Sequence, residues 1–203
     1  MDAWAIMDAW AIMEAMADRD RMVRASRRLS LVLRHRPDSV GLELDEHGWV
    51  AVDDLLTGLA VHSLRLDRAE LERIVATSDK QRFAFDQTGE RIRANQGHSV
   101  VVDLGLRPSA PPPLLFHGTV TRFLPAIARE GLNPGSRQHV HLSADVSTAE
   151  RVGRRRGVPV VLGVDSGTMS ADAAEFFLSV NGVWLTGHVP ARYLSLDGRP
   201  LSA

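Results

Sequence analysis

The chain has 203 residues, of which 44% are hydrophobic, and its formal net charge is −1. This length suffices for a sizeable buried core in one large domain or two small ones. The near-neutral charge argues against a protein that coats nucleic acid non-specifically, since such proteins are usually strongly basic. The absence of cysteine excludes disulfide bonds and cysteine-ligated zinc.

No apolar run reaches the length that spans a bilayer, so we expect no contact with a membrane. The first residues are acidic and lack the basic flank of a signal peptide. We therefore expect a cytoplasmic protein, and we expect it to be a monomer.

The N-terminal extension, residues 1–21, contains an internal repeat. The segment 1–7 (MDAWAIM) is followed by 8–13 (DAWAIM). Its composition favours a helix, and we assign no chemistry to it.

Residues 22–106 show helical patterns followed by a hairpin. A basic amphipathic helix runs from Met22 to the residue before Pro37, where proline disfavours the α conformation. Two short extended pieces surround a turn in 41–50, and Asp53 is placed to cap a short helix. Helices followed by strands at 82–86 and 91–94 predict a winged-helix-like unit. A further helix, opened by a capping box of Asp67 and Glu70, precedes this hairpin.

The segment 107–113 (RPSAPPP) predicts a stiff linker and a domain boundary. Beyond it, residues 114–203 are rich in strand patterns, with a helix over 123–130. A second capping box, Ser147 to Glu150, predicts an arginine-rich helix that stops at Gly157. We therefore predict an α+β fold.

Arginine and histidine gather at two places that are far apart in the sequence. Arg34, His35 and Arg36 end the first basic helix. In an extended segment Arg137, His139 and His141 share one face, which suits binding of an anion. Every basic residue except Lys80 is arginine, whose planar guanidinium suits phosphate, although a GC-rich genome also produces this bias.

Each of these residues also has an ordinary structural explanation. Arg34 at a helix C-terminus complements the helix dipole, and Arg82 could be a solvated partner across a hairpin. A lone histidine in a strand, such as His117, is commonly structural. A metal site at His139 and His141 lacks a nearby carboxylate ligand, so we expect no metal.

Eight motifs together resemble the tRNA 2′-phosphotransferase family, whose NAD-dependent enzymes are built on an ADP-ribosyltransferase fold. They occur in the family's order over about residues 28–196. They are LRHRP (33–37), DEHGW (45–49), SDKQRF (78–83), RANQGHS (93–99), FHGT (116–119), RQHVHLS (137–143), VGRRRG (152–157) and NGVWLT (181–186). The resemblance implies a winged-helix-like RNA lobe in 22–106 and an ADP-ribosyltransferase-like NAD lobe in 114–203.

The resemblance also implies a two-step reaction of the kind used in tRNA splicing. An internal RNA 2′-phosphate attacks NAD and expels nicotinamide, which leaves an ADP-ribosylated RNA intermediate. A ribose hydroxyl then attacks the phosphorus and releases 2′-hydroxyl RNA and ADP-ribose 1″,2″-cyclic phosphate. The implied partners are NAD and a tRNA-like RNA.

The family's catalytic tetrad falls on Arg34, His35, Arg82 and Arg137. A phosphate monoester carries nearly two negative charges, and phosphoryl transfer depends on positioning and charge stabilisation. We therefore expect the arginines to clamp the phosphate. His35 is the member that exchanges a proton near neutral pH, so we expect it to act as general acid or base.

The resemblance assigns two further sets of residues. The expected NAD-binding residues are His117, Gly118, Thr119, His141, Leu142, Ser143, Gly153, Arg155 and Val183. The residues expected to dock RNA are Arg93, Gln96 and His98. At Val183 many ADP-ribosyltransferases have a glutamate, whose charge would repel a phosphate dianion.

Two other functions remain open at this point. An ADP-ribosyltransferase acting on terminal phosphates of nucleic acid, or on protein, would stop after the first step. A winged-helix RNA-binding module with an inactive second domain would not bind NAD.

Overall fold

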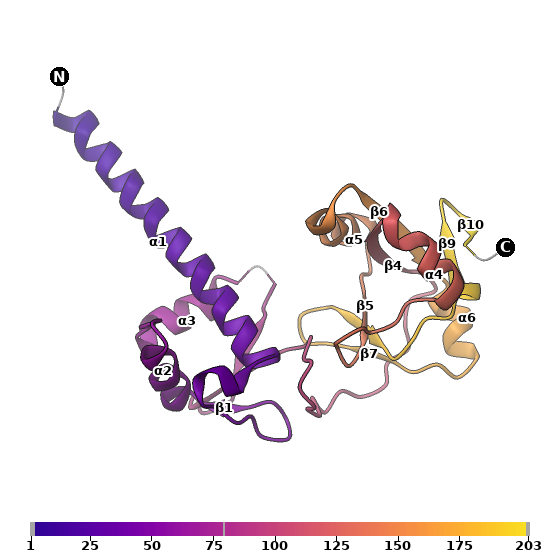
Figure 1. Ribbon diagram of the computed structural model, residues 1–203, viewed down its shortest axis with the longest axis horizontal. Helices are drawn as coiled ribbons and strands as arrows, with labels where there is room; N and C mark the ends of the chain where they lie inside the picture. The colour runs from indigo at the N-terminus through magenta and orange to yellow at the C-terminus, as the bar shows by residue number, and fades with distance from the viewer. Residues whose placement is uncertain (1–2, 79, 202–203) are drawn as a thin grey trace. The chain divides into compact units, whose positions relative to one another are not determined.

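A computed structural model of the chain describes residues 3–78 and 80–201. Its contacts divide the chain into two compact units, Met1–Ala94 and Asn95–Ala203. Both units combine helices with antiparallel strands (Figure 1), so the predicted α+β class is confirmed. In the described part of the chain, no helix is long and apolar enough to cross a membrane.

The division between the units comes before the proline-rich segment. The sequence predicts a boundary at 107–113, whereas the contacts divide the chain after Ala94. Residues 95–106 join the second unit because Gln138 donates its backbone N–H to the His98 carbonyl (3.2 Å) and its Nε2 to the Val102 carbonyl (2.9 Å). The proline-rich segment is also bonded within this unit, where Ser166 Oγ donates to the Pro112 carbonyl at 2.7 Å.

The first unit begins with α1 (Ala3–Arg34), a single helix of 32 residues. It is continuous across the predicted boundary between residues 21 and 22. Its last turns bury Leu29, Val32 and Leu33 completely, so hydrophobic burial anchors this end. A short 3₁₀ helix, η1 (Pro37–Val40), follows, as expected from a proline that ends the α-helix.

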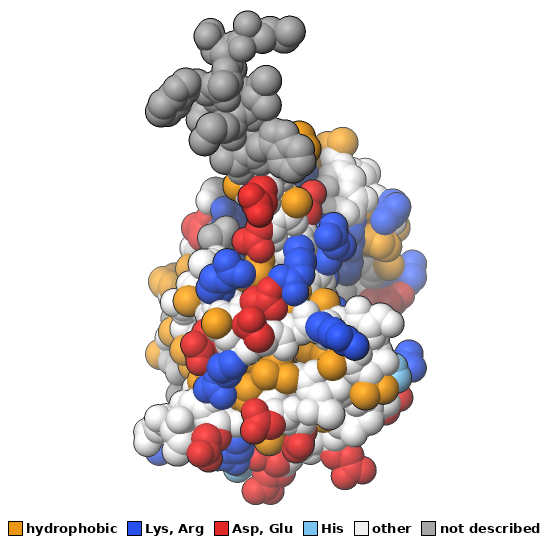
Figure 2. Space-filling view, turned by 90° about the vertical axis from the view of Figure 1, so that its left-hand side faces the viewer, with side chains coloured by type: hydrophobic (Ala, Val, Ile, Leu, Met, Phe, Trp, Pro, Cys, Tyr) orange, Lys and Arg blue, Asp and Glu red, His pale blue; other side chains and the backbone are white. Residues whose placement is uncertain are grey.

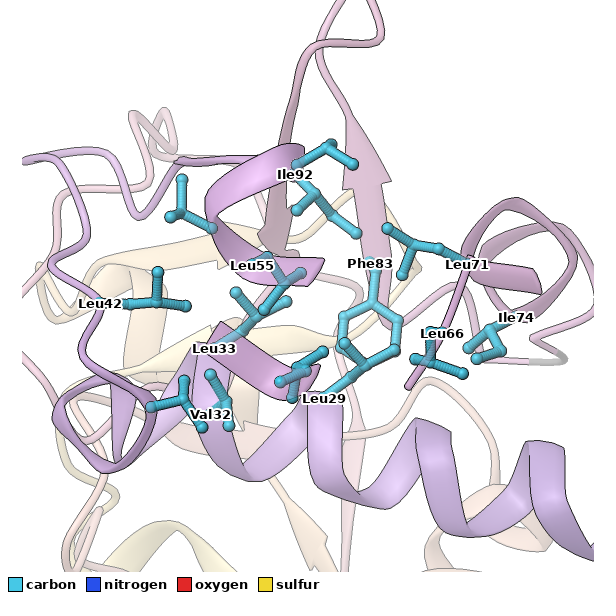
Figure 3. Packing of buried hydrophobic residues seen from close by; sticks show 14 of the residues in the cluster. Leu29, Val32, Leu33, Leu42, Leu55, Leu66, Leu71, Ile74, Phe83 and Ile92 are labelled. Carbon is cyan, nitrogen blue, oxygen red and sulfur yellow. The ribbon is translucent and has the colours of Figure 1, made fainter. Parts of the chain in front are cut away.

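The remaining elements of the first unit surround a three-stranded antiparallel sheet of order β1-β3-β2. In the β2–β3 hairpin Phe83 lies opposite Ala94, and Phe85 lies opposite Ile92, which confirms the predicted hairpin. Figure 3 shows Phe83 and Ile92 in one core with Leu29 and Leu33 of α1. These elements are β1 (Val50–Ala51), α2 (Val52–Val61), α3 (Arg68–Ala76), β2 (Phe83–Phe85) and β3 (Arg91–Ala94).

The two helix starts predicted in this unit have different outcomes. The capping box before α3 is confirmed, since Asp67 Oδ1 accepts from the Glu70 N–H (2.7 Å) and Glu70 Oε2 accepts from the Asp67 N–H (3.0 Å). The cap at Asp53 is wrong. The N-cap of α2 is Ala51, which has no side-chain cap, and Asp53 lies in the first turn.

The second unit contains two antiparallel sheets, of order β10-β9-β6-β4 and β5-β8-β7. Its core includes Leu115, Leu142, Leu162 and Phe176. Its strands are β4 (Leu115–Val120), β5 (Val140–Leu142), β6 (Pro159–Val164), β7 (Phe176–Leu178), β8 (Trp184–Thr186), β9 (Leu194–Leu196) and β10 (Arg199–Pro200). Its helices are η2 (Thr121–Phe123), α4 (Leu124–Glu130), α5 (Val146–Gly153), η3 (Arg154–Arg156), α6 (Ser166–Ala171) and η4 (Ala191–Tyr193).

The predicted capping box at Ser147 is wrong. Asp145 is the N-cap of α5 and accepts from the Thr148 N–H at 2.7 Å. The Ser147 hydroxyl donates to the same carboxylate at 2.7 Å, so it supports the cap instead of forming one. The α-helix then ends at Gly153, and the arginines continue as η3.

The surface carries both signs of charge. On the face drawn in Figure 2, basic side chains (blue) are interspersed with aspartate and glutamate side chains (red). This mixture agrees with a formal net charge of −1. A net charge this small does not indicate where a charged ligand binds, so local clusters of like charge must be considered instead.

Candidate functional site

Three of the four predicted catalytic residues belong to the first unit. Arg34 ends α1, and its Nη2 donates to the Arg82 carbonyl at 3.5 Å, the outer limit of a hydrogen bond. Arg82 directs both its backbone N–H and its Nη1 to Ser78 Oγ, each at 3.4 Å. The fold thus brings the Arg34 side chain to the backbone of Arg82, 48 residues later, and His35 directly follows Arg34.

In the second unit an isolated bridge joins the two sheets. Phe116 of β4 and Ser143, just after β5, exchange both backbone hydrogen bonds, at 2.9 and 2.8 Å. This bridge places His117 next to His141, whose carbonyl lies 3.1 Å from His117 Nδ1. A carbonyl only accepts, so Nδ1 carries the proton and Nε2 of the neutral ring has a lone pair.

The surroundings keep His117 uncharged. Burial is the main cause that lowers the pKa of His117 below its ordinary value of 6.5, and the positive charge of Arg156 lowers this pKa further. The hydrogen bond to the His141 carbonyl acts in the opposite direction. The ring is therefore neutral at physiological pH.

Arg137 lies in the loop before β5, close to other arginines. Part of its side chain is exposed, yet desolvation of the guanidinium, followed by the charges of Arg156 and Arg155, lowers the pKa of Arg137. The charge of Arg156 acts on both Arg137 and His117, so Arg156 lies within electrostatic reach of both groups. We call Arg137, Arg155, Arg156 and His117 the basic cluster.

Carboxylates do not neutralise the basic cluster. Among residues 3–78 and 80–201, no carboxylate oxygen lies within 4.0 Å, the limit for an ion pair, of the guanidinium nitrogens of Arg137, Arg155 or Arg156. The neighbouring Arg154, in contrast, pairs with Glu150 at 2.8 Å. Several cations without a countercharge form a site for an anion, and guanidinium groups suit phosphate oxygens.

Comparison with known proteins identifies the family. The family model "RNA 2'-phosphotransferase, Tpt1 / KptA family" matches residues 20–188 of the chain. The chain belongs to this family. The prediction that rested on eight ordered motifs is thereby confirmed.

Individual relatives agree with this result. A probable RNA 2′-phosphotransferase of Agrobacterium fabrum is 58% identical over 172 residues, which cover 85% of this chain and 92% of that protein. One from Streptomyces coelicolor is 55% identical over 175 residues, covering 86% and 95%. One from Streptomyces griseus is 52% identical over 188 residues, covering 89% and 100%.

In this member of the family, two glycines expected to contact NAD lie where β4 and α5 pack together: Gly118 of β4 faces α5, and Gly153 of α5 faces β4. A Cβ on Gly118 would lie 1.8 Å from the Ala149 carbonyl oxygen, and one on Gly153 would lie 2.7 Å from the Thr119 carbonyl oxygen. Thr119 itself is 3% exposed. The glycines therefore let β4 and α5 approach each other closely.

Two other residues expected at the NAD site have clear local roles. The Leu142 side chain is in the core, 1% exposed, so only its backbone could face a ligand. Val183 lies in the turn between β7 and β8, where its N–H donates to Ser179 Oγ at 3.0 Å and its carbonyl accepts from the Ser179 N–H at 3.0 Å.

The three residues expected to dock RNA belong to different units. Arg93 lies in β3 of the first unit, with its guanidinium carbon 4.5 Å from the centre of the Trp49 ring. Gln96 belongs to the second unit, and its Oε1 lies 2.6 Å from His141 Nε2. His98 is buried in this unit at 1% exposed.

Arg156 is the residue that the sequence did not single out. The run of arginines from 154 to 156 offers three candidates, of which the family resemblance assigns Arg155 to NAD. The distinguishing signal is tertiary, since Arg154 is occupied by Glu150 whereas Arg156 acts on His117. For metals, the described residues contain no group of three or more possible ligands.

Proposed function

We propose that the chain transfers an internal 2′-phosphate of RNA to ADP-ribose in an NAD-dependent reaction. The products are 2′-hydroxyl RNA, nicotinamide and ADP-ribose 1″,2″-cyclic phosphate. One observation carries the proposal: in a member of the RNA 2′-phosphotransferase family, Arg137, Arg155 and Arg156 have no carboxylate partner among the described residues, and the charge of Arg156 acts on both Arg137 and the neutral His117. Such a site suits phosphate groups.

We assign the RNA 2′-phosphate to Arg34, Arg82 and Arg137. A phosphate ester that is nearly dianionic needs several cations to stabilise the charge that moves during transfer. His35, directly after Arg34, exchanges a proton with a ribose hydroxyl, because imidazole titrates near neutral pH.

The basic cluster fits NAD by the chemistry of its donors. Arg155 and Arg156 offer planar donors for a pyrophosphate. Neutral His117 offers Nε2 as an acceptor, and His141 and Ser143 lie on the adjacent strand segment. When bound, NAD supplies the ribose carbon to which the phosphate is joined.

We propose that the first unit is a winged-helix-like RNA lobe and that the second is an ADP-ribosyltransferase-like lobe. In support, helices of the first unit pack on a small three-stranded sheet, and the last two strands of this unit, β2 and β3, form a hairpin. The second unit is built from two antiparallel sheets of four and three strands.

The alternative function is ADP-ribosylation of terminal phosphates of nucleic acid. It would use the basic cluster alone and would leave ADP-ribose attached to the product. The presence of Arg34 and Arg82 in one unit, where the Arg34 guanidinium bonds to the Arg82 backbone, supports the full transfer, since we assign both residues to the 2′-phosphate.

The test is to incubate the protein with an oligoribonucleotide that carries one internal 2′-phosphate, with and without NAD. We expect loss of the 2′-phosphate and release of nicotinamide only when NAD is present. Phosphate loss without NAD would contradict the proposal, and stable ADP-ribosylated RNA would favour the alternative.

A further inference from the structure

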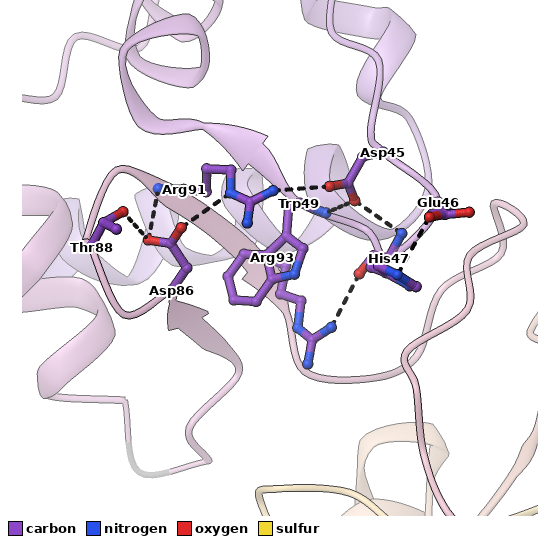
Figure 4. A network of polar contacts seen from close by, with 8 residues as sticks. All are labelled: Asp45, Glu46, His47, Trp49, Asp86, Thr88, Arg91 and Arg93. Carbon is purple, nitrogen blue, oxygen red and sulfur yellow. Dashed lines mark hydrogen bonds and ion pairs between the residues drawn. The ribbon is translucent and has the colours of Figure 1, made fainter.

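In the first unit, one aromatic ring and two arginines share the face of the sheet opposite the core (Figure 4). In β3, Ile92 is fully buried, so Arg91 and Arg93, its neighbours in the strand, point to the opposite face. Their guanidinium carbons lie 5.7 and 4.5 Å from the centre of the half-buried Trp49 ring. We call Trp49 and Arg93 the stacking pair.

The backbone of Trp49 is held rigidly by Asp45. Asp45 Oδ1 accepts from the Trp49 N–H at 2.8 Å and from the His47 N–H at 2.9 Å. The Asp45 N–H in turn donates to the Trp49 carbonyl at 2.9 Å. The backbone that carries the ring is thus fixed before any ligand arrives, which reduces the entropy lost on binding.

The two arginines differ in their charge partners. Arg91 pairs with Asp45 at 3.3 Å and with Asp86 at 3.1 Å. Arg93 donates from Nη1 to the His47 carbonyl at 3.2 Å, and within the described residues no carboxylate reaches its guanidinium at ion-pair distance. The charge of Arg91 is therefore neutralised, whereas that of Arg93 is available to an anion.

The sheet register relates the stacking pair to Arg82. Arg93 lies opposite Ala84 of β2, and Arg82 directly precedes this strand. On the other side of β3 lies β1, which Trp49 directly precedes. Trp49, Arg93 and Arg82 therefore lie at the same end of one three-stranded sheet.

We infer that Trp49 stacks on the base of a nucleotide next to the 2′-phosphorylated one, and that Arg93 binds the backbone phosphate between them. An aromatic ring beside a cation is the usual platform for single-stranded RNA, because every base has a face that stacks. The inference rests on the proposed function, since that function assigns the 2′-phosphate to Arg82.

The test measures binding without NAD, by fluorescence anisotropy, on two labelled oligoribonucleotides with one internal 2′-phosphate. One has all its bases, and the other lacks the bases on both neighbouring nucleotides. We expect Trp49→Leu to weaken binding of the complete RNA roughly tenfold, the loss of one base–aromatic stack. The same variant should bind the abasic RNA as the wild type does, and Trp49→Phe should keep most of the affinity.

Three results would overturn the inference. They are unchanged binding of the complete RNA by Trp49→Leu, an equal loss on both RNAs, and no binding of the complete RNA by the wild type. An equal loss would mean that the ring acts only on the fold, which urea unfolding of each variant checks. Because binding is measured without NAD, a wild type that binds this RNA but transfers no phosphate once NAD is added contradicts the proposed function and not the stacking.

A matched pair of variants tests the arginine. Arg93→Gln should weaken binding and reduce the salt dependence of affinity by about one phosphate contact. Arg68→Gln is the control, because Arg68 also lies over an aromatic ring, at 5.4 Å from Phe85, but pairs with Glu72 at 2.8 Å. It should bind RNA as the wild type does, and equal losses in the two variants would count against the role of Arg93.

Discussion

The ring of His117 in β4 is held by the backbone of His141 in β5, through a hydrogen bond of 3.1 Å from Nδ1 to the carbonyl. This bond lies beside the bridge that joins the two sheets of the second unit. It fixes the tautomer of a neutral histidine whose pKa is lowered by burial and by the charge of Arg156.

Arg156→Gln should raise the pKa of His117. The charge of Arg156 lowers this pKa, so its removal makes protonation of the ring easier. Burial remains, and the pKa should therefore stay below 6.5. A pH titration of the histidine resonances by NMR measures the change. Arg154→Gln is the control, because Arg154 is paired with Glu150, and an unchanged His117 pKa in Arg156→Gln would contradict the account.

Stability should fall as the pH falls below about 6.5. The pKa of His117 is lower in the folded protein than its ordinary value of 6.5, so below that pH the unfolded chain binds a proton that the folded protein does not. The contribution is fully present above 6.5 and is lost as the pH falls through the lowered pKa. Urea unfolding between pH 7.5 and 5 measures it, and His117→Gln should have a shallower dependence than the wild type.

Gly118→Ala should destabilise the protein by about 3 kcal/mol, the cost of strong overpacking. The added Cβ would lie 1.8 Å from the Ala149 carbonyl oxygen, and backbone on both sides cannot easily move away. Urea unfolding measures the loss. Gly187→Ala is the matched control, since a Cβ there would have no atom within 4 Å. Equal stability of the two variants would show that β4 and α5 do not pack this closely.

The sequence predicts the elements whose signals are local. The capping box at Asp67 and Glu70 and the β2–β3 hairpin occur as predicted, because each depends on residues only a few positions apart. The helix α1 also ends near Pro37, as the local effect of proline requires.

Other features depend on contacts that a sequence pattern does not contain. Ser147 has the spacing of a capping box, but Asp145, two residues earlier, captures its hydroxyl and caps α5. The role of Gly118 depends on a helix about 30 residues later in the chain. Similarly, Arg155 and Arg156 look alike in the sequence, and only the fold places the charge of Arg156 next to His117.

Arg137→Gln should reduce turnover of a 2′-phosphorylated RNA at least about a hundredfold, the effect of removing one donor that stabilises developing charge. The guanidinium has no carboxylate partner among the described residues, so its charge is available to a ligand. Steady-state kinetics with saturating NAD measure the loss. Arg154→Gln removes the same charge from an ion-paired arginine and should stay within about twofold of the wild type.

His35→Ala should slow the second step more than the first. If the imidazole moves a proton on the ribose hydroxyl, its loss should slow the second step by roughly 10² to 10⁴-fold, the usual contribution of general acid–base catalysis. ADP-ribosylated RNA should then accumulate. Gel analysis of labelled RNA over time detects this species. Full turnover with no accumulation would remove the assigned role of His35.

The central claim is tested most directly by following the phosphorus atom itself. An oligoribonucleotide with a radiolabelled internal 2′-phosphate is incubated with the protein and NAD, and the label and the released nicotinamide are quantified together. We predict that the label appears in ADP-ribose 1″,2″-cyclic phosphate, with one nicotinamide released for each phosphate transferred. Label recovered as inorganic phosphate, without release of nicotinamide, would contradict the account.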